Sequence, residues 1–141
     1  MKTTKFSSLV LIKKEKLDEI ERQIIDVQSR KRGLEKKIEK KKEEIRKFEF
    51  PDKGSMSQYQ LSKEQFSLQM KTLEDLKASY DLRLKQLDGL KELYKEANIE
   101  HEKFLALEEE EIKKANKLKI YLESKEMDEV ANILTQMKKR G

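Results

Sequence analysis

The residues that could do chemistry are few and scattered. The chain of 141 residues has one histidine, His101, no cysteine, and four glycines that are spread along it. A metal site would need further ligands at fixed spacing, and only carboxylates lie near His101. The lack of cysteine excludes a disulfide framework and a thiolate metal site, and the glycines form no phosphate-binding loop. We therefore interpret His101 as a packing residue with one polar edge.

The densest group of carboxylates is the run "LEEEEIKK" at residues 107–114. Acid chemistry is one interpretation of this run. The favoured one is an exposed helix face on which Glu and Lys residues pair four positions apart. Since no set of polar groups converges on a concave site, the sequence predicts that the protein is not an enzyme. It predicts no metal, no cofactor and no small-molecule substrate.

The most basic stretch is "RKRGLEKKIEKKKEEIRK", residues 30–47, with ten Lys or Arg against four Glu. The favoured interpretation is the solvated flank of a coiled coil, and the second is an electrostatic patch for an acidic protein partner. Nucleic acid ranks third, because no aromatic residues alternate with the basic ones and the lysines surround the helix. The net charge of +5 is too small to require such a partner, so no nucleic acid is predicted.

The composition indicates which elements must carry these residues. Charged residues make up 43% of the chain and hydrophobic ones 35%, which suits either a long coiled coil or disorder. From Val10 to Phe48, nine of twelve heptad positions are apolar, the exceptions being three lysines. A heptad repeat sustained this far favours a coiled coil. The exceptions are Lys13, Lys31 and Lys41, which weaken the pairing locally.

The heptad pattern returns from Leu73 to Phe104 and loosens near residue 105. Between the two patterns lies "FEFPDKGSMSQ", where Pro51 cannot continue a helix. The sequence therefore predicts an all-α fold: two long helices in an antiparallel coiled-coil hairpin, with the second helix longer. The predicted single domain, 1–141, contains helix 1 at about 5–49, a turn at 50–57, helix 2 at about 58–123 and a C-terminal segment at 124–141.

Three details of this hairpin depend on local patterns. Ser57 or Ser62 is predicted to cap the second helix, with "SKEQ" as a capping box. If the two helices pair residue by residue outward from the turn, the start of the first helix lies opposite residue 101 of the second, and the pairing is predicted to end there. The C-terminal segment then either stands as a bare helix or folds back, with Ser124 available to cap a short C-terminal helix.

Aromatic residues gather around the predicted turn. Phe48, Phe50, Tyr59 and Phe66 are four of the nine aromatic residues in the chain. They could pack against one another and hold the turn closed. Alternatively, they could form a contact patch for a partner, because aromatic residues are common interface anchors. The sequence gives the two interpretations equal weight.

Three stretches resemble the FliJ family, the small coiled-coil component of the bacterial flagellar type III export ATPase complex. They are "KFSSLVLIKKEKLDE" near the start, "EQFSLQMKTLEDLKASYDLRLKQL" at 64–87 and "KEMDEVANILTQMKKR" at 125–140. The family often carries Trp, which is absent here, and a late Tyr in the first helix, where this chain has Ile45 and Phe48. The resemblance is to a divergent member or to a homologue from an injection-type system.

The resemblance implies a role without catalysis, as the stalk of a hexameric export ATPase that it regulates, linked to the membrane export gate. Some members of the family also bind export chaperones. The residues implied to face the ATPase are Phe6, Leu9, Val10, Met127, Asp128, Glu129, Val130 and Ala131. Those implied to face the export gate are Ile38, Ile45, Phe48, Gln69, Leu73, Leu76 and Tyr80.

The implied location is the cytoplasm, at the inner-membrane base of the flagellum, in a motility function. The short apolar run "SSLVLI" is interpreted as the first turns of a helix, because signal sequences need a longer one. The alternative function is that of a generic coiled-coil adaptor or a substrate-holding chaperone that uses the aromatic residues of the turn as clamps.

Overall fold

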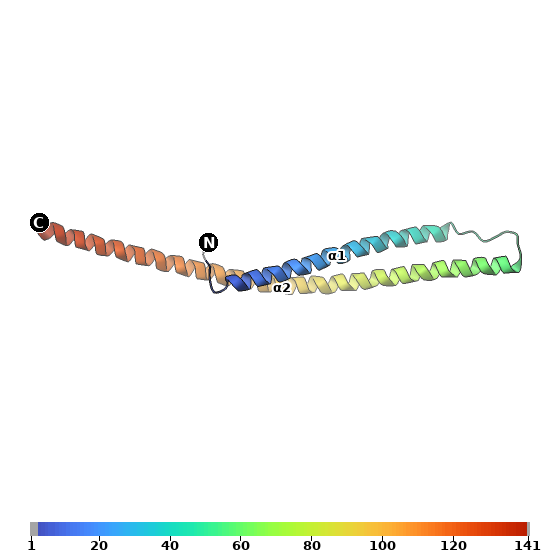
Figure 1. Cartoon of the computed structure of the whole chain (residues 1–141), viewed down its shortest axis with the longest axis horizontal. Helices are drawn as coiled ribbons and strands as arrows, with labels where there is room; N and C mark the ends of the chain where they lie inside the picture. The colour runs from blue at the N-terminus through green and yellow to red at the C-terminus, as the bar shows by residue number, and fades with distance from the viewer. Residues whose placement is uncertain (1–2, 141) are drawn as a thin grey trace. The chain divides into compact units, whose positions relative to one another are not determined.

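The computed structural model describes residues 3–140 and consists of two helices, α1 (Ser7–Arg46) and α2 (Met56–Arg140) (Figure 1). They pack against each other in opposite directions, and the described residues contain no strand. With 85 residues against 40, α2 is the longer helix. This confirms the predicted all-α fold.

The chain divides into two compact units. The first is Asp18–Glu96, and the second joins the part of α1 before Asp18 to α2 from Ala97 onward. We call them the inner unit and the outer unit. The single domain expected over residues 1–141 stays a prediction.

α1 begins at Ser7, slightly later than expected, and Thr4 caps the turn that leads into it. The Thr4 Oγ1 atom accepts a hydrogen bond from the Phe6 N–H at 3.1 Å. In return, the Thr4 N–H donates to Ser7 Oγ at 2.8 Å. This reciprocal arrangement satisfies backbone donors that the first turn of a helix leaves without partners.

α2 begins at Met56, and its cap corrects the prediction of Ser57 or Ser62. Ser55 is the capping residue: its Oγ accepts from the Gln58 N–H at 3.2 Å, and its own N–H donates to Gln58 Oε1 at 3.3 Å. The same Ser-x-x-Gln pattern occurs at 55–58 and 62–65. The first occurrence caps the helix because it directly follows Gly54, whose φ of +155° reverses the chain there.

The aromatic residues of the turn pack against one another, as the first of the two interpretations expected. Phe66 on α2 lies 5.5 Å from the rings of both Phe48 and Phe50, and Phe50 lies 5.9 Å from Tyr59, measured between ring centroids. After Arg46 the chain therefore runs beside the first turns of α2 instead of reversing at once.

This path shifts the pairing of the two helices and corrects the expectation that pairing ends near residue 101. Ser7 donates a hydrogen bond to Glu108 at 3.4 Å, and Lys5 Nζ lies 3.7 Å from a carboxylate oxygen of Glu111. The shift arises because Phe48 faces Phe66, well inside α2.

The heptad positions form the contact between the helices. In the inner unit, Val27, Leu87 and Leu90 form a buried cluster, with Ile24 packed against it. The lysines at heptad positions keep their charged ends at the rim: Lys31 reaches Glu35 at 3.9 Å and Lys41 reaches Glu44 at 2.7 Å. The narrow core explains how a chain with so few apolar residues can fold.

α2 continues through Ser124 to Arg140 without a break. Of the two alternatives for the C-terminal segment, the structure has the bare continuing helix and no separate one. The described part of this segment has neither glycine nor proline, and it includes three Lys, two Glu and two Met, which are strong helix formers. Residue 141 lies outside the described residues.

Candidate partner-binding surfaces

The last part of α2 is the most exposed stretch of helix among the described residues. Every residue from 117 to 140, here called the terminal segment, is exposed. Its apolar residues recur at spacings of three and four, so they share one face. Met127 is 73% exposed and Leu134 is 55% exposed, although both are large and apolar. The members of this terminal stripe are Ile120, Met127, Val130, Leu134 and Met137.

A shallow groove follows the terminal stripe. It is apolar at its centre and carries the carboxylates of Glu123 and Glu126 at one end; its other lining residues are Met127, Val130, Ala131 and Leu134. Three of the residues expected to face the ATPase therefore line one surface. Asp128 and Glu129 are exposed but do not line the groove. The arrangement suits an apolar partner face with basic groups beside it.

The N-terminal members of the same expected set lie elsewhere. Phe6 packs against Phe104, with 6.4 Å between the ring centroids. Lys13 Nζ lies 5.7 Å above the Phe104 ring and 3.9 Å from Glu100. Along α2, Phe104 and Met127 are separated by about 34 Å at the helical rise. The expected ATPase-facing residues thus occupy two separate places on the outer unit, with Leu9 exposed and Val10 half-buried at the first.

The residues expected to face the export gate belong to the contact between α1 and α2 in the inner unit. Ile38 and Leu73 are each only 8% exposed. The other five, Ile45, Phe48, Gln69, Leu76 and Tyr80, are half-buried. A partner would therefore meet the edges of these side chains while the rest of each side chain packs between the helices.

One accessible edge of this set is a shallow groove beside Tyr80. Its lining is Glu35, Ile38, Glu39, Lys42, Lys77 and Tyr80. The Tyr80 hydroxyl donates to Glu35 Oε1 at 3.3 Å. Desolvation and this hydrogen bond raise the pKa of Tyr80, so the hydroxyl stays protonated as a donor at neutral pH. Elsewhere in the heptad contact, the buried Oε1 of Gln69 accepts no hydrogen bond from any described residue.

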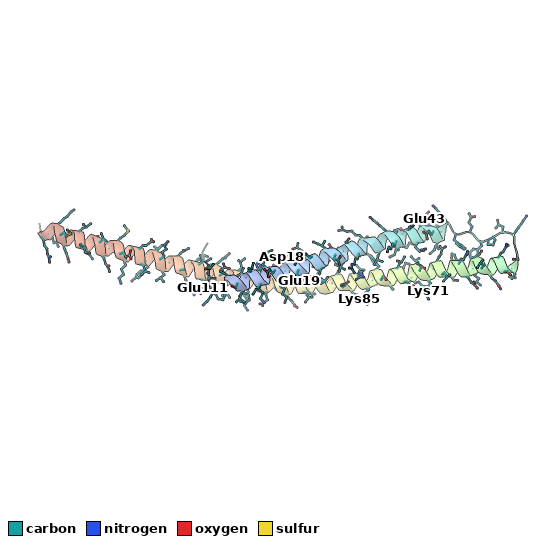
Figure 2. The ribbon with its side chains drawn as sticks, viewed as in Figure 1. Asp18, Glu19, Glu43, Lys71, Lys85 and Glu111 are labelled. Atoms are coloured by element: carbon teal, nitrogen blue, oxygen red, sulfur yellow. The ribbon has the colours of Figure 1, made fainter. Side chains whose placement is uncertain are left out.

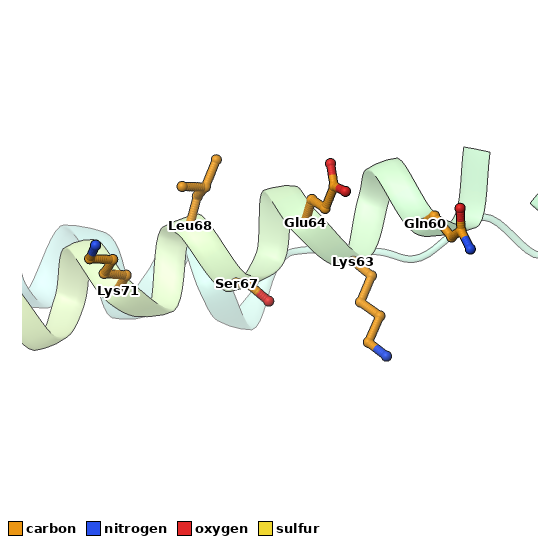
Figure 3. Close-up of a pocket in the computed structure, with 6 residues that line it drawn as sticks. All are labelled: Gln60, Lys63, Glu64, Ser67, Leu68 and Lys71. Atoms are coloured by element: carbon orange, nitrogen blue, oxygen red, sulfur yellow. The ribbon is translucent and has the colours of Figure 1, made fainter. Parts of the chain in front are cut away.

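Sequence reasoning missed a second exposed apolar row on α2. Leu61, Leu68 and Leu82 are 56%, 65% and 62% exposed. Leu68 stands out from the helix in a shallow hollow (Figure 3) that is also lined by Gln60, Lys63, Glu64, Ser67 and Lys71. Leu61, Leu68 and Leu82 are separated by seven and fourteen residues and lie outside the heptad positions that pair with α1. This regular spacing is the signal from which the sequence analysis could have predicted the row.

Nothing in the described residues gathers into a catalytic or metal centre. Residues 3–140 include no group of three His, Cys, Asp or Glu side chains placed to hold a metal ion. His101 is half-buried on α2, in the outer unit. Across the same residues, neither helix has the length and hydropathy that would let it cross a membrane.

Comparison with known proteins gives one family. The family model described as "Flagellar FliJ protein" matches residues 1–140 of the chain. Neither the curated proteins nor the solved structures contain a match.

Proposed function

We propose that this chain, which belongs to the FliJ family of flagellar export components, acts as the stalk of the hexameric export ATPase without catalysing a reaction itself. In this role the terminal segment enters the ring and promotes its assembly and its hydrolysis of ATP. The protein then works by binding, at the cytoplasmic base of the flagellum.

The observation that carries this proposal is the terminal stripe. Exposed large apolar residues on one continuous helix face are typical of partner-binding surfaces. Met127, Val130 and Leu134 have no covering element among the described residues, and Glu123 and Glu126 lie beside them. A ring whose pore is apolar with basic groups complements this surface.

The second contact in the proposal is with the export gate, through the inner unit. Tyr80 and Ile45 are half-buried and share the heptad contact with Ile38. Their exposed edges support the proposed export-gate contact, because a partner can reach them without unfolding the helix pair. The rival role, a chaperone that clamps substrates with the aromatic residues of the turn, is less well supported. Those rings already pack against one another.

The test is the rate of ATP hydrolysis and the extent of hexamer formation by the cognate export ATPase, with and without this protein. We expect the full chain to raise both, and a chain truncated after Glu123 to lose the effect. The sharper variant is Val130→Ser with Leu134→Ser. Its matched control is Asn132→Ser with Gln136→Ser, which lie on the opposite face of the same helix.

Stimulation that depends on Val130 and Leu134 but not on Asn132 and Gln136 supports the stalk role. Stimulation that survives truncation after Glu123 would contradict the placement of the terminal segment in the ring. A complete lack of binding to the ATPase would leave the adaptor role as the better account.

A further inference from the structure

The charges of the terminal segment fall into two groups. Residues 120–129 hold four carboxylates and one lysine, a net charge of −3, whereas residues 130–140 hold three basic side chains and no acid, a net charge of +3. The basic side chains are Lys138, Lys139 and Arg140, in the last turn of α2. All three are exposed, and none forms an ion pair with a described residue. The proposed pore contact uses the carboxylates and gives these cations no role.

The apolar residues of the terminal segment have the spacing of a coiled-coil seam. Steps of three, four and three residues separate the members of this seam, which are Met127, Val130, Leu134 and Met137. Each of them is more than half exposed. All of residues 117–140, which follow the Glu111 labelled in Figure 2, are likewise exposed. The terminal segment therefore carries one half of a helix–helix contact, and no described part of the chain supplies the other half.

A second copy of the chain, running in the opposite direction, can supply that half. When Val130 of one copy lies opposite Leu134 of the other, Met127 lies opposite Met137, because both pairs are centred on residue 132. Four apolar layers then form around one twofold axis. In each layer the two side chains hold the seam positions that face each other in an antiparallel coiled coil.

The charges favour this orientation over the parallel one. With the axis at residue 132, the acidic part of each copy runs along the basic turn of the other. Glu126 and Arg140 lie on the same edge of the seam, two heptads apart, so each Glu126 faces the Arg140 of the other copy. In a parallel pair, Glu123 would face its own copy, because it holds the seam position four residues before Met127.

The same charges select the occupant of the seam. A uniformly basic partner would repel the last turn of α2, and a uniformly acidic one would repel residues 123–129. A second copy presents both charges in the reverse order. We propose that two copies of the chain associate in opposite directions through their terminal segments. The pair would cover the surface proposed to enter the ATPase ring until the ring displaces one copy, a consequence that rests on the proposed function.

The first test is sedimentation equilibrium of the full chain. We expect a weak, reversible equilibrium between monomer and dimer, because the paired surface is small. The variant V130S/L134S should abolish the dimer, and its control N132S/Q136S, on the opposite face of the helix, should leave it unchanged. A chain that stays monomeric up to about 1 mM would overturn the proposal. A dimer that survives V130S/L134S would also overturn it.

Exchange of charges tests the contact between Glu126 and Arg140. Either E126R or R140E alone should weaken the dimer about tenfold, because two attractive contacts become repulsive. The double variant E126R/R140E restores opposite charges and should recover most of the association. Equal weakening in all three variants would overturn the antiparallel pairing.

Cross-linking tests the orientation directly. The chain has no cysteine, so an introduced one is the single site for a short bismaleimide. A131C lies beside the proposed axis and should cross-link to its own copy. The control is I120C, whose two copies would lie about 36 Å apart at the helical rise and should not react together. Efficient cross-linking of both would indicate a parallel pair and overturn the proposal.

These three measurements use the protein without the ATPase. Failure of the self-association and failure of the stalk role are therefore distinguishable.

Discussion

At the scale of single residues, similar side chains on α2 have very different roles. Leu87 is 4% exposed and belongs to the buried cluster with Val27 and Leu90. Leu82, five residues earlier on the same helix, is 62% exposed. The difference follows from heptad position, because only one face of α2 meets α1 in the inner unit.

This contrast gives a prediction for two matched substitutions. Leu87→Ala should lower the free energy of unfolding by about 2 kcal/mol or more, since it removes buried apolar surface and leaves a cavity. Leu82→Ala should change it by less than about 0.5 kcal/mol. Urea unfolding followed by circular dichroism measures both. Equal effects from the two substitutions would contradict the heptad packing described here.

At the scale of elements, the ends of the helices depend on a few local contacts. The turn before α2 needs Gly54, because its φ of +155° is one that other residues rarely adopt. A Cβ atom at this position would also collide with the Gln58 side chain that caps α2. Gly33, in the middle of α1, has no neighbouring atom that a Cβ would meet.

The two glycines are therefore predicted to respond in opposite directions to the same change. Gly33→Ala should stabilise the protein by about 0.5–1 kcal/mol, because alanine favours a helix more than glycine does. Gly54→Ala should destabilise it by about 1–3 kcal/mol through backbone strain and loss of the cap. Thermal unfolding of the two variants beside the parent chain provides the measurement. Stabilisation by both would show that the turn does not need a glycine.

At the scale of the whole molecule, stability is distributed unevenly along the chain. The inner unit has a buried cluster, whereas the terminal segment of the outer unit has no buried residue. A helix without tertiary contacts depends on its intrinsic propensity alone, and this is marginal in water. Local opening should therefore be frequent there.

Hydrogen exchange tests this distribution. Backbone amides of the terminal segment should exchange far faster than those around Val27 and Leu87, and addition of the export ATPase should slow them selectively. The measurement is made at a protein concentration too low for the terminal segments of two copies to pair. Protection of the terminal segment in the free protein that equals that of the buried cluster would contradict the exposure found here.

Much of this architecture could be predicted from the sequence. The heptad repeat identified both helices and the residues that pack between them, because an α-helix brings positions three and four apart onto one face whatever surrounds it. Pro51 located the break for a similarly local reason. The family match to residues 1–140 agrees with the resemblance drawn from residues 5–19, 64–87 and 125–140.

Other features depend on contacts between distant residues, and only the tertiary structure decided them. The pairing reaches Glu111 because Phe48 and Phe50 pack on Phe66, and no periodicity within one helix reports how far the connecting segment travels. Ser55 caps α2 because Gly54 turns the chain just before it. Arg32, Lys36, Lys37 and Lys40 could be identified as unpaired with any described residue only after the ion pairs of the other six basic residues in 30–47 were known. Charge alone does not show which side chains are within reach of one another.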